Sequence, residues 1–231
     1  MIRLIMYDLD GTLLDTASEI AAAVNLTLAH YGAQAVPEAT VKSWVGHGAA
    51  QLMRNAWQTI VPGPTYEETM QTFTRFYQQT VGTSSRPFPQ VMETLQHFRS
   101  AGVLQAVITN KESVFTRRVL KTHGMSDFFA LVVSGDTLPV KKPDPAMVRH
   151  CLQTLAVRAE ESLFVGDSDI DVATAKAAGV RCWVVPYGYN GGRDIGEAGA
   201  DRMIADMGEL RTLIGKISAD CRLVECDGMR G

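Results

Sequence analysis

Five short segments of the chain are nearly unbroken runs of apolar residues. They are rich in β-branched side chains and apolar on both faces, as in parallel strands that helices cover on each side. The five predicted strands span residues 2–7, 104–109, 130–134, 162–165 and 181–186. Between them the apolar positions follow a helical period, which predicts helices at residues 91–101, 113–123, 145–156 and 170–178. This alternation predicts an α/β fold with a doubly wound parallel sheet.

A long helical segment interrupts this alternation directly after the first strand. It contains no convincing strand pattern and has two capping-box patterns, Thr16 to Glu19 and Thr65 to Glu68. In a capping box, a threonine and the glutamate three residues later satisfy backbone N–H groups at the start of a helix. The predicted organisation is therefore a core of residues 1–15 and 87–215 and an inserted helical cap of residues 16–86.

The composition excludes several classes of function. The 231 residues include 25 acidic and 22 basic side chains, for a net charge of −3. A chain without a basic excess is poorly suited to displacing counterions from nucleic acid. No apolar run approaches the roughly 18 residues that cross a bilayer. We expect a cytoplasmic monomer or homodimer that has neither nucleic acid nor a membrane as a partner.

The four cysteines do not have the spacing of a metal site. Cys151, Cys182, Cys221 and Cys226 are too few and too scattered for a disulfide framework in a chain of this length, so we expect reduced thiols. The last two fall in residues 216–231, which have no periodic pattern and are predicted to form a disordered tail.

Polar residues that can handle phosphate follow four of the predicted strands. Asp8 and Asp10 come after the first, and Thr109 ends the second. Lys142 lies beyond the third, and Asp167 follows the fourth. Ligands of open parallel sheets bind beyond the carboxyl ends of the strands, so these groups are predicted to converge on one point.

The predicted arrangement suits phosphoryl transfer with a divalent cation. In an extended segment Asp8 and Asp10 face the same side, and Gly11 allows a sharp turn. Asp8, Asp167 and an oxygen of Asp10 offer the hard oxygen ligands that Mg²⁺ prefers. Lys142 supplies a positive charge for phosphate and Thr109 a hydroxyl donor. A carboxylate beside both cations becomes a plausible nucleophile.

Each of these residues also has an ordinary structural interpretation. A single aspartate at a strand end is more often a helix cap or a turn former. Asp169 and Asp171 can simply favour the start of the following helix, which is the preferred interpretation for Asp169. Lys141 can be a solvated surface charge. The functional interpretation rests on the whole set, in this order and at strand ends.

Four segments of the sequence resemble the motifs of the haloacid dehalogenase superfamily of phosphohydrolases. They are Asp8-Leu-Asp-Gly-Thr-Leu-Leu-Asp15, the apolar run ending in Thr109-Asn110, Lys142-Pro143-Asp-Pro145 and Val165-Gly-Asp-Ser-Asp-Ile-Asp171. The resemblance extends to about residue 213 and implies a Rossmann-like core with a helical cap. The dehalogenases themselves lack a carboxylate at the position of Asp10, which argues against carbon–halogen chemistry here.

The resemblance also implies a role for each motif residue. Asp8 is the expected nucleophile that forms an aspartyl-phosphate, and Asp10 the general acid and then base. The expected Mg²⁺ ligands are Asp8, Asp10 and Asp167. Asp171 is expected to orient these ligands without contacting the ion itself. The residues expected to hold phosphate are Thr12, Thr109, Asn110 and Lys142.

Within the superfamily the chain looks most similar to phosphoglycolate phosphatases. Softer signals carry this likeness, including Gly135-Asp-Thr-Leu-Pro139, Tyr187-Gly-Tyr-Asn190 and Trp44-Val-Gly-His-Gly-Ala49 in the cap. The expected function is Mg²⁺-dependent hydrolysis of a small phosphomonoester, with 2-phosphoglycolate as the leading substrate. Gly46, His47 and Gly48 are expected to read the end of the substrate that carries no phosphate, although this loop can equally be a plain turn.

Two alternatives stay open at this stage. One is a sugar-phosphate phosphatase or phosphomutase, because specificity in this superfamily lies in the cap. The cap carries four basic and four acidic side chains, so no cation in it indicates a carboxylate-bearing substrate. The other is a phospho-aspartate signalling or binding module, although such receivers are shorter and have no cap. Catalysis through a Schiff base with the substrate is not expected, because it would need a lysine in the cap. The only lysine there is Lys42, and nothing in the sequence places it near Asp8.

Overall fold

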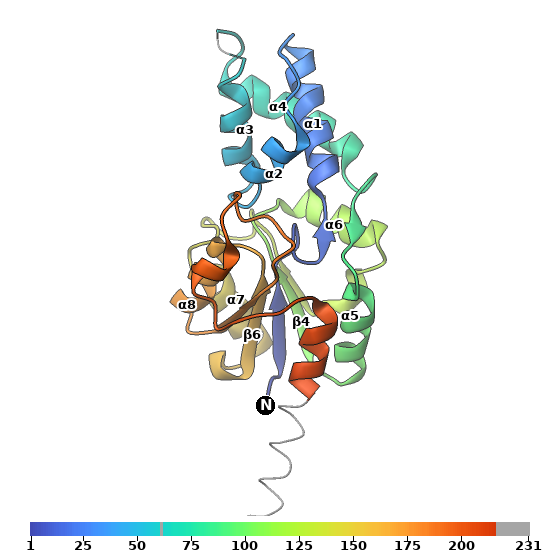
Figure 1. Ribbon diagram of the computed structural model, residues 1–231, viewed down its shortest axis with the longest axis vertical. Helices are drawn as coiled ribbons and strands as arrows, with labels where there is room; N and C mark the ends of the chain where they lie inside the picture. The colour runs from blue at the N-terminus through green and yellow to red at the C-terminus, as the bar shows by residue number, and fades with distance from the viewer. Residues whose placement is uncertain (61, 216–231) are drawn as a thin grey trace, which may run out of the picture.

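The computed structural model describes residues 1–60 and 62–215. Its core is one sheet of six parallel strands in the order β5-β4-β1-β6-β7-β8, with β1 near the centre (Figure 1). The strands are β1 (Leu4–Tyr7), β4 (Leu104–Ile108), β5 (Leu131–Val133), β6 (Ser162–Gly166), β7 (Arg181–Val184) and β8 (Arg202–Met203). All five predicted strands are confirmed, and β8 is too short to stand out as an apolar run.

Helices cover both faces of the sheet because its strands are apolar on both faces. Ile5 and Tyr7 of β1 pack in the cluster that includes side chains of helices α5 and α6, while Leu4 and Met6 pack with those of α7 and α8. These helices are α5 (Val91–Ser100), α6 (Ser113–Thr122), α7 (Ala146–Leu155) and α8 (Asp169–Ala177), as predicted within one or two residues. Residues 207–215 are also helical. Short 3₁₀ helices η1 (Ser126–Phe128), η2 (Ala159–Glu161) and η3 (Ile195–Ala198) complete the core.

Four helices follow β1 and lie together beyond one end of the sheet (Figure 1). They are α1 (Ala17–His30), α2 (Glu38–Trp44), α3 (Ala49–Trp57) and α4 (Tyr66–Thr80). A two-stranded antiparallel ribbon joins them to the core, in which β2 (Leu14–Asp15) pairs with β3 (Arg86–Pro87). The boundaries expected for the cap fall in this ribbon. We call α1–α4 and their loops the cap.

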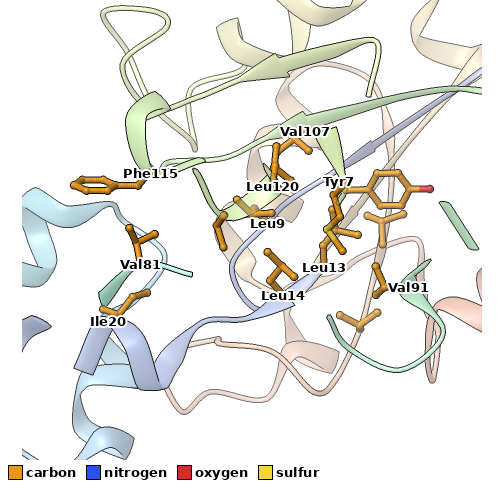
Figure 2. Packing of buried hydrophobic residues seen from close by; sticks show 14 of the residues in the cluster. Tyr7, Leu9, Leu13, Leu14, Ile20, Val81, Val91, Val107, Phe115 and Leu120 are labelled. Atoms are coloured by element: carbon orange, nitrogen blue, oxygen red, sulfur yellow. The ribbon is translucent and has the colours of Figure 1, made fainter. Parts of the chain in front are cut away.

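The cap and the sheet share one apolar cluster. Figure 2 shows Leu9 close to Val107 and Leu120 of the core, with Ile20 of α1 and Phe115 of α6 facing the same region. All five side chains are buried. Burial of apolar area at this boundary stabilises the arrangement in which the cap lies against the strand ends.

One of the two predicted capping boxes is wrong. The Thr16 side chain makes no cap bond to α1, because its hydroxyl donates to Asp10 Oδ1 at 2.8 Å. Glu19 is fully buried, and its Oε2 accepts the backbone N–H groups of Gly82 and Ser85 at 2.7 and 3.1 Å. Glu19 therefore fastens the chain that returns from the cap.

The capping box at the start of α4 is confirmed. Thr65 Oγ1 accepts from the backbone N–H of Glu68 at 3.2 Å, and Glu68 Oε2 accepts from that of Thr65 at 2.8 Å. At this exposed position no tertiary partner competes for either side chain, so the local pattern decides the structure.

The described cysteines are buried free thiols. Burial raises the pKa of Cys151 to about 12, which keeps this thiol protonated and unreactive. Cys221, Cys226 and the predicted tail lie outside the described residues. None of the described helices combines the length and the apolar character that crossing a bilayer requires.

Candidate active site

The sheet order brings the predicted strand ends together. β1 lies between β4 and β6, so Asp8, Thr109 and Asp167 follow three neighbouring strands at the same edge. All three side chains are buried, at 7, 2 and 2% exposure. The carboxyl edge of a parallel sheet is where such folds bind ligands.

Three carboxylates form the centre of this site. Asp8, Asp167 and Asp171 each offer an oxygen, and these oxygens lie within 4.8 Å of one another. Burial raises the pKa of Asp8 to about 7, although the nearby Lys142 opposes the shift. Burial and the charges of the other two carboxylates raise the pKa of Asp167 well above its ordinary value. Buried like charges in this arrangement call for a cation.

Lys142 is the buried cation beside two of these carboxylates. Its Nζ lies 2.9 Å from Asp8 Oδ1 and 2.7 Å from Asp171 Oδ1. Burial alone would lower the pKa of Lys142, but Asp171 and Asp8 hold it above the ordinary value, so the ammonium stays charged. Within the described chain, Asp8 Oδ1 accepts no well-aligned hydrogen bond despite this short contact. Among the described residues, the Lys142 ammonium is therefore the charge that balances this oxygen.

Asp171 fixes the direction of Lys142. Its Oδ2 accepts from the backbone N–H groups of Asp167 and Ser168, both at 3.1 Å, and from Ser168 Oγ at 2.7 Å. Its Oδ1 accepts from Lys142 Nζ. Both oxygens are thus committed to protein donors, as expected of a group that supports the site from behind. Asp169 instead opens α8 and pairs with the exposed Arg193 at 2.7 Å, which agrees with its structural interpretation.

Residues after β1 and β7 hold Asp167. Thr12 Oγ1 donates to Asp167 Oδ1 at 2.6 Å, and the backbone N–H of Tyr189 donates to Oδ2 at 2.5 Å. Gly11 has φ +92°, and a Cβ there would lie 2.3 Å from Asp167 Oδ2. Only glycine therefore fits between the turn after β1 and this carboxylate. In this structure the Thr12 hydroxyl serves Asp167.

Asn110 connects the core to the cap loop. Its Nδ2 donates to the carbonyl oxygens of Gly46 and Lys142 at 2.9 and 3.0 Å, and its Oδ1 accepts from the backbone N–H of Lys142 at 2.9 Å. The side chain therefore positions the lysine loop and the cap in this structure. Thr109 lies nearby with its Oγ1 3.3 Å from the backbone N–H of Lys111.

Lys111 and Tyr77 are functional candidates that the sequence reasoning missed. Lys111 Nζ lies 3.0 and 3.1 Å from the two carboxylate oxygens of Asp10 and also donates to the Tyr77 hydroxyl. Although burial lowers the pKa of Lys111, Asp10 and Tyr77 hold it above the ordinary value. The available signal was the position of Lys111 directly after Thr109-Asn110. No sequence signal indicated that a tyrosine of α4 would meet it.

A cavity lies between the cap and these strand ends. The core contributes Asp8, Asp10, Thr109, Asn110, Lys111 and Glu112 to its lining, and the cap contributes Ile20, Val45, Gly46, Gly48, Ala49, Leu52, Phe73 and Tyr77. Measured to the centres of water-sized molecules, its volume is about 50 Å³. The cavity thus joins acidic and basic groups at its floor to an apolar roof.

The structure places the three residues predicted to form the cap loop of the site, Gly46, His47 and Gly48, in two different environments. Gly46 and Gly48, in the loop between α2 and α3, line the cavity, with φ values of +126° and +84°. His47 is exposed and lines a separate hollow beside Ser168 and Asn190. The glycines therefore bring backbone close to the site, while the imidazole lies outside the cavity.

Sequence comparison assigns the family of this site. Residues 5–185 match the family model described as haloacid dehalogenase-like hydrolase, so the chain belongs to this family. The expected Rossmann-like α/β core with its helical insertion is confirmed. The chain is therefore a hydrolytic enzyme, and its curated relatives place it among the phosphatases.

Those relatives share most of their length with this chain. It is 38% identical over 221 residues to a phosphoglycolate phosphatase of Nitrosospira multiformis, covering 94% of this chain and 97% of that one. It is 40% identical over 219 residues to a phosphoglycolate phosphatase of Vibrio cholerae, covering 92 and 97%. A crystal structure of a predicted phosphoglycolate phosphatase from Haemophilus somnus 129pt has a TM-score of 0.89 at 28% identity, covering 92% of this chain and 98% of that one.

Proposed function

We propose that this enzyme hydrolyses 2-phosphoglycolate to glycolate and phosphate, with Asp8 as the group that carries the phosphoryl unit. The observation that carries the proposal is the setting of Asp8. Its Oδ1 is buried, lies 2.9 Å from Lys142 Nζ and accepts no aligned hydrogen bond from the described residues. The same residue lines the cavity under the cap. A carboxylate that lines the cavity beside a lysine is well placed to attack a phosphoester whose charge the same lysine balances.

In the first step an Asp8 carboxylate oxygen attacks the phosphorus atom. The bond between phosphorus and the glycolate oxygen breaks, and an aspartyl-phosphate forms. Asp10 also lines the cavity, with its carboxylate facing Lys111 and Thr16. In the proposed step it turns toward the departing alkoxide oxygen in its protonated form and donates that proton. Lys142 holds the phosphoryl oxygens and balances their charge, while the Thr109 hydroxyl donates to them.

In the second step water attacks the same phosphorus atom. Asp10, now ionised, takes a proton from this water as the bond between phosphorus and Asp8 breaks. Phosphate is released and Asp8 regains its carboxylate. The cap excludes other water during both steps, which strengthens the charge interactions at the floor of the cavity.

The residues present fit a bound Mg²⁺. Oxygens of Asp8, Asp167 and Asp171 lie within 4.8 Å of one another, and one oxygen of Asp8 is orphaned. Asp171 accepts four hydrogen bonds, including one from the Lys142 ammonium, whereas Asp167 accepts two. Asp8 and Asp167 are therefore the side chains proposed to hold the ion. The Asp10 carboxylate faces Lys111 and Thr16 instead, so any ligand from Asp10 is proposed to be its backbone oxygen. When bound, Mg²⁺ screens the repulsion between carboxylate and phosphate.

The size of the cavity supports a small substrate. A volume of about 50 Å³ to the centres of water-sized molecules corresponds to a few waters. A two-carbon phosphoester is smaller than a sugar phosphate and is therefore the better match to this space. We further propose that residues 16–86 form the domain that opens to admit substrate, and that the enzyme is cytoplasmic.

A phosphate-release assay across small phosphorylated metabolites, with and without Mg²⁺, tests this function. We expect 2-phosphoglycolate to give the highest kcat/KM and chelation to abolish turnover. Asp8→Asn should remove activity without unfolding the protein, while Asp169→Asn, a partly exposed aspartate two residues from Asp167, serves as the matched control. A preference for sugar phosphates would replace the proposed substrate, and an active Asp8→Asn variant would refute the role of Asp8.

A further inference from the structure

We propose that Lys111, positioned by Tyr77 of the cap, binds the carboxylate of the substrate and thereby determines specificity. The inference deepens the proposed function and rests on it, since it assigns the end of 2-phosphoglycolate that carries no phosphate. Neither residue belongs to the motifs by which the chain was interpreted from sequence. Both line the cavity that contains Asp8 and Asp10.

Lys111 places a buried positive charge, held by several contacts, on the cavity floor. Its side chain is only 4% exposed, and its Nζ contacts the Asp10 carboxylate at 3.0 Å and the Tyr77 hydroxyl. The ammonium also lies 4.9 Å from the centre of the Tyr77 ring. A buried ammonium with few degrees of freedom is costly to keep unless it meets an anion. The contacts therefore hold a positive charge at a fixed point beside the reacting groups.

Charge complementarity selects the partner of this group. Among the described residues that line the cavity, Lys111 is the only one with a positive charge, while the roof is apolar. Lys142 contacts two carboxylates, those of Asp8 and Asp171, and is assigned to the phosphoryl group. Lys111 contacts one carboxylate among the described residues, that of Asp10, and unlike Lys142 it lines the cavity. A substrate with a second anionic group about two carbon atoms from its phosphate must therefore place that group near Lys111. A neutral alcohol in the same position would leave the ammonium without this partner.

Tyr77 makes the proposed carboxylate-binding position at Lys111 depend on closure of the cap. It belongs to α4 of the cap, its hydroxyl reaches Lys111, and its ring packs 4.5 Å from that of Phe115 in the core. Closing the cap therefore completes the surroundings of the ammonium. A substrate whose carboxylate binds there stabilises the closed arrangement in which the reaction proceeds.

The experiment compares two substrates that differ only at the end distal to the phosphate. These are 2-phosphoglycolate and 2-hydroxyethyl phosphate, in which an alcohol replaces the carboxylate. For each variant we take the ratio of kcat/KM for the two substrates, because any effect of Lys111 on Asp10 is common to both and cancels. Lys111→Met should lower this ratio about 10- to 150-fold, the range for losing a hydrogen bond to a charged group, mainly through KM.

Two further variants keep the test decisive. Tyr77→Phe removes only the hydroxyl that positions the Lys111 ammonium. It should lower the ratio about 3- to 10-fold, less than the loss of the ammonium itself. Lys141→Met is the control, because Lys141 pairs with Glu112 at 3.3 Å, is one-third exposed and does not line the cavity. Its ratio should match that of the wild type.

The possible outcomes separate this inference from the proposed function. Equal losses for the two substrates in Lys111→Met would overturn the inference, because Lys111 would then act through Asp10 alone. A wild-type enzyme that hydrolyses both substrates equally well would also overturn it while leaving phosphatase activity in place. A wild type inactive on both substrates would refute the proposed function and the inference together.

Discussion

Replacing Asp171 with asparagine tests how the site holds its buried lysine. Asp171 has no exposed surface, and both its oxygens accept hydrogen bonds. Asparagine keeps the shape but turns one acceptor into a donor, which must then face either Lys142 or the backbone N–H groups before α8. The ammonium of Lys142 also loses one of its two counter-charges.

The structure allows the size of this effect to be worked out. Removing one partner of a buried ion pair costs about 3–5 kcal/mol of unfolding free energy. For a chain of this length about 2–4 °C accompanies each kcal/mol, so the melting temperature should fall by about 6–20 °C. Because Lys142 is then less firmly oriented, we expect kcat/KM to fall about 10- to 100-fold as well.

Differential scanning fluorimetry and urea unfolding measure the first effect, and phosphate release measures the second. Asp169→Asn is the control. The side chains of Asp169 and its partner Arg193 are 35% and 63% exposed, so their ion pair should contribute less than about 1 kcal/mol to the free energy of unfolding. If the two substitutions shift the unfolding midpoint equally, Asp171 does not hold Lys142 in the way described here.

Three further predictions follow from the same contacts. Adding Mg²⁺ should raise the melting temperature by several degrees, because the clustered carboxylates repel one another without a cation. EDTA should reverse this rise. An unchanged melting temperature would contradict the proposed metal site. Gly11→Ala should lower activity at least about 100-fold by pushing Asp167 aside, whereas Gly32→Ala, whose Cβ meets nothing within 4 Å, should leave activity unchanged. Tyr189→Phe removes a hydroxyl that accepts hydrogen bonds from the backbone at the start of α1. Urea unfolding should show a free energy of unfolding lower by about 1–3 kcal/mol. A smaller effect would mean that this hydroxyl does not anchor the cap.

The core could be predicted because its signals are local. Each buried strand is a short apolar run, and the polar groups after it belong to one edge once the sheet is parallel. Asp8 and Asp167 lie together, and Thr109 lines the same cavity as Asp8. Lys142 reaches Asp8 although it lies on a loop beyond β5.

The cap and its contacts could not be predicted in the same way. Thr16 and Glu19 fit a local capping pattern, but tertiary partners on Asp10 and on the returning chain compete for both side chains and win. Tyr77 and Lys111 are 34 positions apart and meet only because α4 of the cap lies against α6 of the core, where Tyr77 packs on Phe115. Such contacts depend on how one element docks on another, and neither periodicity nor spacing records that.

The most direct measurement is to locate the phosphoryl group on the protein. Asp10→Ala removes both the acid of the first step and the base of the second. The variant should still accept phosphate from 2-phosphoglycolate, at a reduced rate, and release it more slowly still. Rapid acid quench in the cold followed by peptide mass spectrometry should then find one phosphoryl group on Asp8, and none when Asp8→Asn is added. Phosphate release without any phosphorylated Asp8 peptide, or a label on another residue, would contradict the account.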